Sequence, residues 1–549
     1  MISRSGTVRS WCNVSQGVTK ILAAVCGDVF SSSRNNNNNN NTINNHTAVS
    51  AGGEGHAAMR PGTVPSAAVA HLRNTTAEKK EPVYRAVPST RAGRAVGFAS
   101  LFMQLGWDHL VGTQQGGLLS SHSHERIVNT LCRMRGAVLK LGQMLSIQDA
   151  ATVPPHITQI FERVRDSAYA MPREQLDRTL AKEYHNSNWR KELFVQFDDE
   201  PMAAASIGQV HRAVLKGKDG AQVEEAAAVK VQYPGVARSI DSDVSNLKML
   251  ITLNLLPPKV QYPGVARSID SDVSNLKMLI TLNLLPPGMF VDNILQELRE
   301  ELALECRYSV EAEKQMRYAV LIQQDPQLRE TFIVPKVYES LSTDSVLVTE
   351  LITGVPIDRL ATVSGMQELK NYVAQRMFLL TLSELFRWHF MQTDPNYSNF
   401  LFDATTNKIG LLDFGAAREY SAEFVQDYID VVAAAAREDR DTIIEKSIKL
   451  GFLTGHEMKE MLDAHVQSVV LLGKPFRYRD KPFDFAAEHL PSQIQAYVPT
   501  MIKLRLRPPP TPVYSLHRRL SGTILLATKL KATVNVGDIF WDIYDNPKM

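Results

Sequence analysis

Apolar side chains recur at helical spacing between Glu125 and Gln148. They alternate steps of four and three residues, which places them on one face of an amphipathic helix. Lys140 and Gln143 fall on a different face one turn apart, and Gly142 beside them permits a close backbone approach. Taken alone, these are a solvated Lys and Gln on a surface helix. The apolar positions are Ile127, Leu131, Met134, Val138, Leu141 and Leu145.

Further apolar runs predict strands and helices downstream. We expect strands at residues 210–215, 226–231 and 346–351, and helices at residues 298–318, 378–390 and 425–436. The stretch between the last two helices begins with a loop and continues as a strand, to about Phe402.

The N-terminal residues have the composition of a targeting segment. Residues 1–27 carry basic side chains and serines but no Asp or Glu, which is typical of a mitochondrial transit peptide. We expect a transit peptide at residues 1–30; the alternative is an unstructured N-terminus with no targeting role. Seven consecutive asparagines from Asn35 to Asn41 cannot bury apolar area, so residues 31–86 are expected to form a disordered linker.

A basic segment, Arg91 to Arg94, leads into an apolar run of thirteen residues from Ala95 to Trp107. That length is too short to span a bilayer as a helix. The run is either a core helix or a helix lying on a membrane surface, and we expect peripheral membrane contact through residues 91–107. No other stretch is long and apolar enough to cross a membrane.

Charge and cysteine content exclude several classes of function. The formal net charge is +2 with no basic run interleaved with aromatics, so no nucleic-acid partner is expected. The four cysteines are scattered, which predicts neither a disulfide framework nor a zinc site and fits a reducing compartment. A chain of 549 residues is long enough for two or three domains.

Two carboxylates carry the strongest chemical signal. Asp394 is followed five residues later by Asn399, and Asp413 opens the sequence Asp-Phe-Gly. This order and spacing are typical of the protein-kinase fold, in which the first Asp orients the attacking group while the Asn and the second Asp hold Mg²⁺ against the nucleotide phosphates. The sequence therefore predicts an α+β, bilobal, kinase-like fold, with a small β-rich N-lobe and a helical C-lobe, that binds ATP or ADP with Mg²⁺.

An alanine-rich segment lies where a kinase has its glycine-rich loop. Glycines in such loops let backbone N–H groups approach phosphates, whereas alanine narrows the allowed backbone angles. We expect the loop still to cover a nucleotide, with altered preference and turnover; a small-residue turn without a ligand is the alternative. The candidate nucleotide-binding residues are Ala203, Ala204, Ala205, Ser206, Ile207, Gly208, Gln209 and Val210.

Lys230 ends an Ala-Val run that matches the strand carrying a kinase's phosphate-binding lysine. Such a lysine needs a glutamate from a following helix, and the acid-rich helix at 298–318 offers Glu305 and Glu311. The strand that ends near Glu350 is expected to enter the hinge between the lobes, where backbone groups would meet adenine. That assignment rests on order along the chain alone.

Residues 230–258 recur without a single change as residues 259–287. Two copies are too few for a solenoid, which leaves a recent tandem duplication or an error in the gene model. Lys259 follows two prolines that cannot donate to a sheet ladder, so Lys230 is the better candidate for the nucleotide.

The segment after Asp413-Phe414-Gly415 is short. The chain enters the helix at 425–436 almost directly, without an Ala-Pro-Glu sequence and without a long activation segment. Because that segment normally docks a peptide substrate, its absence argues against a protein kinase.

Together these residues resemble the UbiB family of atypical kinases, most closely the mitochondrial type that acts in coenzyme Q (ubiquinone) biosynthesis. The resemblance covers roughly residues 87–549. Long specific strings carry it, at residues 139–149, 203–211, 231–236, 301–306, 391–396, 508–510 and 514–518.

The resemblance implies a family-specific helical extension at residues 87–195 that folds over the nucleotide site. Its Lys-x-Gly-Gln motif consists of Lys140, Gly142 and Gln143, and Lys140 is expected to reach toward Glu305. Glu311 is expected to pair with Lys230.

One departure from the family pattern concerns the helix that carries these glutamates. The family has Glu-x-Asp, but this chain has Glu305-Cys306-Arg307, a base in place of the second acid. The resemblance therefore assigns no dependable metal or lysine contact to position 307.

The implied organisation continues with an N-lobe at residues 196–350, which includes both copies of the repeat, and a C-lobe at residues 351–549.

The implied function is an atypical kinase or ATPase on the matrix side of the mitochondrial inner membrane. It would support coenzyme Q biosynthesis by ATP hydrolysis or by acting on a small or lipid substrate. The alternative is a nucleotide-gated lipid-binding scaffold with little catalysis. The implied partners are coenzyme Q biosynthetic proteins and lipid or phenolic quinone precursors; homodimer formation is left open.

Overall fold

The computed structural model describes residues 169–217 except Ser206, residues 225–245 with short gaps, residues 291–546, and the short strand β1 (Val83–Tyr84). Several predictions lie outside these described residues. They are the transit peptide, the linker apart from β1, the membrane-contact segment 91–107, the helix with Lys140, Gly142 and Gln143, and the second copy of the repeat. Within the described part of the chain, no helix is long and apolar enough to cross a membrane.

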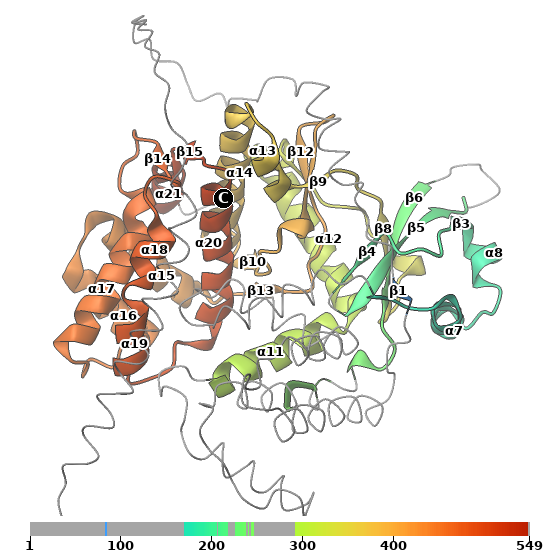
Figure 1. Cartoon of the computed structure of the whole chain (residues 1–549), viewed down its shortest axis with the longest axis horizontal. Helices are drawn as coiled ribbons and strands as arrows, with labels where there is room; N and C mark the ends of the chain where they lie inside the picture. The colour runs from blue at the N-terminus through green and yellow to red at the C-terminus, as the bar shows by residue number, and fades with distance from the viewer. Residues whose placement is uncertain are drawn as a thin grey trace, which may run out of the picture. The chain divides into compact units, whose positions relative to one another are not determined.

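The N-lobe is built on a five-stranded antiparallel sheet (Figure 1). Alternate residues of a strand face opposite sides of a sheet. In β6, Ala227, Val229 and Val231 are fully buried on one side, and Lys230 therefore lies on the other. The strand order is β3 (Phe194–Phe197), β5 (Gly208–Leu215), β6 (Glu225–Gln232) and β8 (Val346–Glu350), with β4 (Ala203–Ala204) paired to β5.

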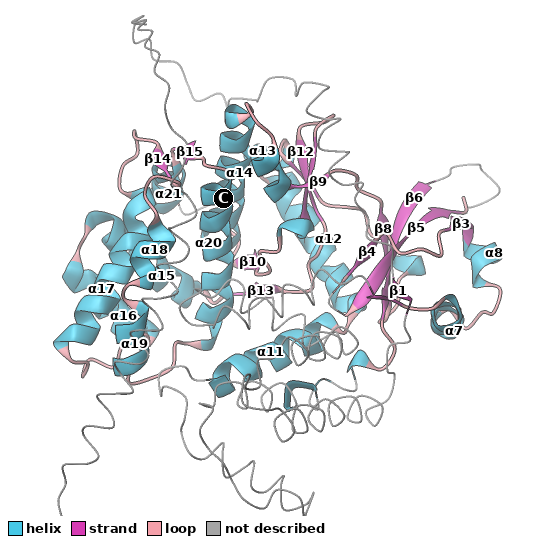
Figure 2. Cartoon of the chain, in the orientation of Figure 1, coloured by secondary structure: helices cyan, strands magenta, loops and turns pink. Residues whose placement is uncertain are grey.

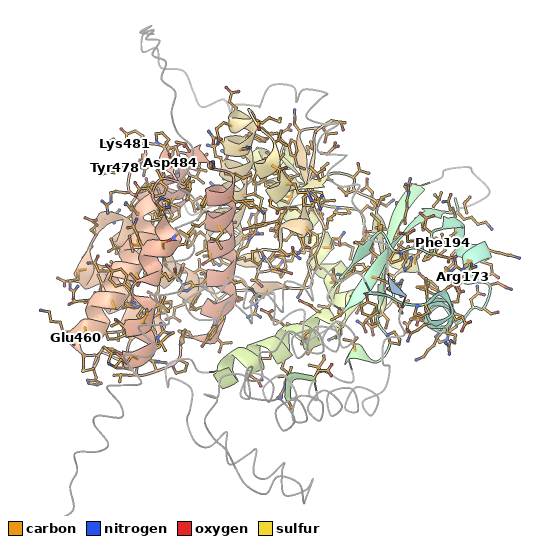
Figure 3. All side chains as sticks on the ribbon, in the orientation of Figure 1. Arg173, Phe194, Glu460, Tyr478, Lys481 and Asp484 are labelled. Carbon is orange, nitrogen blue, oxygen red and sulfur yellow. The ribbon has the colours of Figure 1, made fainter. Side chains whose placement is uncertain are left out.

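Two helices that precede this sheet share its core. Leu176 and Leu180 of α7 (Arg173–Glu183) and Trp189 of α8 (Trp189–Leu193) belong to the same buried cluster as Val229. Trp189 also packs edge-on against Phe194, at 5.9 Å between ring centroids. Figure 3 labels Arg173 and Phe194 on this part of the lobe. The N-lobe core thus draws on residues that the sequence assigned to the extension.

The helical stretch predicted at 298–318 is interrupted. The structure has α11 (Val291–Glu305) and α12 (Tyr308–Gln324), separated by Cys306 and Arg307. Arg307 has extended backbone angles, and the Tyr308 N–H donates to the carbonyl of Asp344 at 3.0 Å. This hydrogen bond and the full burial of the Tyr308 ring in the N-lobe core interrupt the helix at Cys306 and Arg307.

The C-lobe is built around the long helix α14 (Gln367–Phe386), drawn among the other C-lobe helices in Figure 2. Most residues of α14 are buried. It packs against α20 (Thr511–Lys529), α21 (Val536–Asp545) and α15 (Ala422–Arg437). The helix predicted at 378–390 ends four residues early, because the N–H groups of Arg387 and Trp388 both bond to the carbonyl of Ser383 and His389 turns left-handed at φ 52°.

Short strands bring the predicted catalytic segment together. β11 (Phe400–Asp403) and β12 (Lys408–Leu411) form a hairpin flanked by β7 (Phe332–Ile333) and β9 (Val355–Pro356). β10 (Phe390–Gln392) pairs with β13 (Ala417–Glu419), and α15 starts soon after β13. The short segment after Asp-Phe-Gly is therefore confirmed.

The remaining elements complete the outer part of each lobe. Near α21, the ammonium of Lys481 lies 4.7 Å from the ring centre of Tyr478; both side chains are labelled in Figure 3. Separate buried clusters fill the N-lobe and the C-lobe, which confirms the predicted bilobal α+β fold. The elements not yet named are β2 (Tyr169–Ala170), α13 (Pro326–Arg329), α16 (Arg440–Leu450), α17 (Lys459–Gly473), α18 (Leu490–Gln495), α19 (Val498–Leu504), β14 (Phe483–Asp484) and β15 (Thr533–Val534).

Candidate active site

Three charged side chains from three elements meet between the lobes. The ammonium of Lys230, on β6, donates to both carboxylate oxygens of Glu311, on α12, at 2.7 and 3.0 Å. It also donates to the carboxylate of Asp413, which follows β12, at 3.2 Å. The pair predicted between Lys230 and Glu311 is therefore present, and Asp413 joins it.

The electrostatics of this cluster are uneven. Lys230 and Glu311 are 14% and 1% exposed, whereas Asp413 is 31% exposed. Burial alone would lower the pKa of Lys230, but Asp413 and Glu311 outweigh it and raise that pKa well above its usual range. Burial raises the pKa of Glu311 to about 7, with Lys230 opposing and Asp413 adding to the shift. Two carboxylates against one ammonium leave the cluster with negative character at the open side.

Gln392 ties the two predicted catalytic aspartates together. Its side-chain N–H donates to the carbonyl of Asp413 at 2.8 Å, and its side-chain oxygen accepts from the N–H of Asp394 at 2.7 Å. Asp394 in turn accepts from the N–H of Asn396 at 3.1 Å, which orients its carboxylate. One amide thus fixes the spacing between the segments that carry Asp394 and Asp413.

Asn399 and Asp413 lie at the open end of the β11–β12 hairpin. The N–H of Leu412 donates to the carbonyl of Asn399 at 3.0 Å, so the two residues flank the same pair of strands. The side-chain nitrogen of Asn399 is buried and has no hydrogen-bond partner among the described residues. Rotating an amide by half a turn exchanges its oxygen and nitrogen, so this side chain can offer either atom to a ligand.

The alanine-rich segment forms a tight hairpin. Ala203 and Ala204 are exposed in β4 and pair with Val210 and Gln209 of β5, and the N–H of Ala205 donates to the carbonyl of Gly208 at 2.9 Å. The turn includes Ser206, which lies outside the described residues.

Not all of these candidates face the open side of the sheet. The side chain of Gln209 is buried, accepting from the N–H of Met171 at 2.8 Å and bonding His211 at 2.8 Å, and Ile207 belongs to the N-lobe core. Gly208 is close to other groups, because a Cβ there would lie 2.5 Å from the carbonyl oxygen of Val231 and 2.7 Å from the Tyr308 hydroxyl. Any contact of Gln209 or Ile207 with a nucleotide would have to come from the backbone.

Glu305, Glu311 and Lys314 surround the glycine of Asp-Phe-Gly. A Cβ at Gly415 would lie 3.3 Å from Cγ of Glu305 and 3.6 Å from a carboxylate oxygen of Glu311. Lys314 donates to the carbonyl of Gly415 at 2.9 Å. Burial lowers the pKa of Lys314, and Glu311 partly opposes that shift. No sequence pattern singled out Lys314.

Arg307 takes no part in this cluster. It is exposed at the N-cap of α12 and makes no side-chain cap hydrogen bond. Glu350 stands at the end of β8 beside Ala227, where its carboxylate accepts from the N–H of Lys336 at 3.2 Å.

Helix α20 of the C-lobe contributes groups that the sequence patterns did not assign. Arg518 donates to the carbonyl of Thr393, next to Asp394, at 3.1 Å and forms an ion pair with Glu301 of α11. The string at 514–518 that carries part of the resemblance includes Arg518, and it is the signal that marked this helix.

Comparison with known proteins places the site in a family context. The model of the ABC1 atypical kinase-like domain matches residues 163–258 and 258–447. The two matched segments meet at the end of the first copy of the repeat.

Similar proteins are found in several eukaryotes. The chain is 42% identical over 476 residues to "Atypical kinase COQ8B, mitochondrial" of Danio rerio, covering 84% of this chain and 69% of that protein. It is 42% identical over 473 residues to the protein of the same name in Rattus norvegicus, covering 84% and 81%. It is 37% identical over 480 residues to "Atypical kinase COQ8, mitochondrial" of Saccharomyces cerevisiae, covering 85% and 87%. A solved structure of Rv3197 from Mycobacterium tuberculosis with erythromycin aligns at a TM-score of 0.48 and 21% identity, over 76% of this chain and 94% of that chain, which is too distant to support an argument.

Proposed function

The chain belongs to the ABC1 atypical kinase-like family, which implies ATP binding, and from this premise we propose a specific role. It is an atypical kinase or ATPase that supports coenzyme Q biosynthesis in mitochondria. Family membership confirms the predicted resemblance to UbiB atypical kinases. The observation that carries the proposal is the ammonium of Lys230 held between the carboxylates of Glu311 and Asp413.

In this proposal the site holds Mg²⁺ through Asn399 and Asp413. Mg²⁺ prefers oxygen donors and is bound by one or two protein groups together with waters and phosphates. A half-exposed carboxylate beside an amide without a partner among the described residues fits that preference. Asn399 and Asp413 would hold the ion, and its positive charge would offset that of the nucleotide phosphates.

The protein's own groups divide the remaining tasks. Lys230 binds the phosphates, and the alanine hairpin of β4 and β5 lies over the nucleotide. Asp394 orients the attacking oxygen, in a position fixed by Gln392. The acceptor is water or a small or lipid molecule rather than a protein, because α15 follows β13 without a long peptide-docking segment.

The setting proposed for this activity is the matrix side of the mitochondrial inner membrane. The similar proteins from Danio rerio, Rattus norvegicus and Saccharomyces cerevisiae are each named as mitochondrial atypical kinases. Coenzyme Q biosynthetic proteins and lipid or phenolic quinone precursors are the proposed partners. Fractionation of mitochondria, followed by protease protection of the protein, tests this location.

A nucleotide-gated lipid-binding scaffold is the second candidate. Alanines replace phosphate-cradling glycines at 203–205, and this favours slow turnover. ATP hydrolysis measured with and without membranes and a phenolic quinone precursor separates the two. A scaffold binds ATP but hydrolyses it no faster in their presence, whereas an enzyme responds with a higher rate.

The variant Asp394→Asn tests the catalytic assignment directly. Its amide cannot accept the proton of an attacking group, so we expect nucleotide turnover to be abolished while binding is largely retained. Asp403→Asn is the matched control, because the carboxylate of Asp403 accepts hydrogen bonds from Thr405 and Thr406 in the turn after β11. Unchanged turnover in Asp394→Asn would remove Asp394 from the proposed role.

A further inference from the structure

The C-lobe contains a cavity apart from the candidate active site. Its volume is about 230 Å³, and it lies among α14, α15, α17, α18 and α20. The lining is mostly apolar, and none of the lining residues is Asp, Glu, Lys or Arg. Phe378, Leu472, Ile494 and Ile524 supply hydrophobic surface from four different helices. A charged ligand would therefore lose its hydration here without gaining a partner.

The cavity also has a polar corner on α20. His517 and Ser521 lie one helical turn apart and both line it. The ring of His517 stacks on Phe452 with centroids 5.8 Å apart and an interplanar angle of 13°. Neither ring nitrogen forms a hydrogen bond with a described residue. Burial, together with nearby Arg505, lowers the pKa of His517 to about 4, so the neutral imidazole offers one donor and one acceptor at physiological pH.

An adjoining side of α20 contacts the loop that carries Asp394. Next to His517, Arg518 donates to the carbonyl of Thr393 at 3.1 Å. Next to Ser521, the carbonyl of Gly522 accepts from the Tyr397 hydroxyl at 3.1 Å, and a Cβ at Gly522 would collide with Pro395. A molecule in the cavity therefore touches residues whose immediate neighbours hold the loop of Asp394.

We propose that this cavity binds a small, uncharged, mostly apolar molecule with one hydroxyl or carbonyl group, and that its occupancy is coupled through α20 to the nucleotide site. The size follows from packing, because an apolar cavity of about 150 Å³ accommodates benzene. This cavity therefore takes a single ring with a short substituent. The polar group of the ligand bonds the imidazole of His517, with Ser521 one turn further along α20. The proposal is independent of which molecule receives phosphate.

Binding is tested on the full chain with three probes of similar size. These are 4-ethylbenzyl alcohol, 4-ethyltoluene and 4-ethylbenzoate, and ligand-observed NMR measures their affinity. We expect the alcohol to bind most tightly, the hydrocarbon about tenfold more weakly for want of a hydrogen bond, and the carboxylate not at all. Failure of the alcohol to bind overturns the proposal, including the case in which another part of the chain fills the cavity.

Two variants locate the bound probe. Ile494→Trp places an indole at the cavity wall and should abolish binding, while Leu506→Trp, at an exposed position, should leave it unchanged. His517→Phe keeps the ring but removes its nitrogens. It should weaken the alcohol about tenfold and leave 4-ethyltoluene unaffected. Equal binding of the alcohol to the wild type and both cavity variants would place it elsewhere and overturn the assignment.

Coupling is tested without measuring turnover. The dissociation constant of a fluorescent ADP analogue with Mg²⁺ is measured with and without saturating 4-ethylbenzyl alcohol. We expect a shift of at least about twofold, and thermodynamic linkage requires the probe's affinity to change by the same factor when ADP is bound. Bound probe with an unchanged nucleotide affinity would overturn the coupling while leaving the binding site in place. Loss of turnover in Asp394→Asn would not affect either result.

Discussion

Two buried charge clusters in this protein are built in opposite ways. The cluster at Lys230 joins one ammonium to two carboxylates, and Asp413 remains partly open to solvent. The cluster at Arg519 joins one guanidinium to one carboxylate, Glu384, at 3.1 Å, and both side chains are almost completely buried. The first is unbalanced and accessible, whereas the second is balanced and sealed.

The sealed pair of Glu384 and Arg519 links two helices in the core of the C-lobe. Glu384 lies on α14 and Arg519 on α20, and Glu384 also accepts from the Tyr318 hydroxyl and from the backbone N–H of Gln392. Burial raises the pKa of Glu384 to about 7, and Arg519 opposes the shift. The difference teaches that burial of charge alone does not mark an active site. An excess of one sign beside an opening is what leaves the Lys230 cluster able to attract a cation.

The largest effect is expected on breaking the sealed pair. Glu384→Ala leaves the guanidinium of Arg519 buried without a counter-charge, so the free energy of unfolding should fall by about 3–5 kcal/mol. Urea denaturation measures this loss. Glu419→Ala is the control, because Glu419 pairs with Arg317 in an exposed ion pair worth under about 1 kcal/mol.

A double variant tests whether Glu384 and Arg519 contribute anything beyond neutralising each other's charge. Glu384→Leu combined with Arg519→Met removes both charges and should recover part of the lost stability, but not all of it, because the Tyr318 hydroxyl and the Gln392 N–H still lack their acceptor. If the double variant is as unstable as Glu384→Ala, the comparison fails, because the pair would then have a role beyond mutual neutralisation.

Breaking the open cluster should affect chemistry rather than stability. Asp413→Asn removes the exposed carboxylate and is expected to lower turnover by about 10²–10³-fold. The melting temperature should change little, because Lys230 keeps Glu311 as its counter-charge when the carboxylate of Asp413 is removed. Steady-state ATP hydrolysis and calorimetry on one preparation measure both quantities. A large loss of stability with normal turnover would reverse the roles of the two clusters.

Acid should lower the stability of the protein through two buried histidines. Burial lowers the pKa of His465 and of His517 to about 4, from 6.5 in the unfolded chain. The unfolded state therefore binds protons more tightly, and stability present above pH 6.5 is lost as the pH falls toward 4. The loss is on the order of 3 kcal/mol for each histidine. In His517→Phe, the free energy of unfolding measured by urea denaturation should depend less on pH between 6.5 and 4. An unchanged pH dependence would rule out His517 as a source of the acid sensitivity.

The smallest effect concerns the departure at position 307. Arg307 stands at the N-cap of α12, where a carboxylate would accept backbone N–H bonds and favour the helix dipole. Arg307→Asp should raise the free energy of unfolding by about 1 kcal/mol. Arg307→Ala provides no cap and should change little. Equal stabilities of the two variants would show that the cap does not form.

The sequence predicted best what is local or closely spaced. The strand of Lys230 follows from its Ala-Val run, and Asp394, Asn399 and Asp413 lie within a stretch short enough for spacing to indicate a shared site. The role of Gln392 could not be predicted from the sequence. Its two hydrogen bonds depend on β10 and β13 pairing, which no local pattern specifies.

Contacts across long stretches of chain were beyond prediction. Arg519 and Glu384 are polar residues on long helices, where a solvated face is the ordinary expectation, and they meet only because α14 and α20 pack together. Gln209 turns into the N-lobe because Met171 and His211 offer it hydrogen bonds. The break between α11 and α12 likewise depends on Asp344, a partner that is distant along the chain.

The contacts of α20 have a consequence for synthesis of the protein. Ribosomes deliver a chain from its N-terminus, and segments fold as they emerge. A nascent chain extending through α17 already contains Lys230, Asp394 and Asp413, yet it lacks Arg518 and Gly522, which hold the loop of Asp394. The hydrogen bonds from α20 to this loop therefore form only after α20 has emerged, and we expect the loop of Asp394 to lack its final position in a shorter nascent chain.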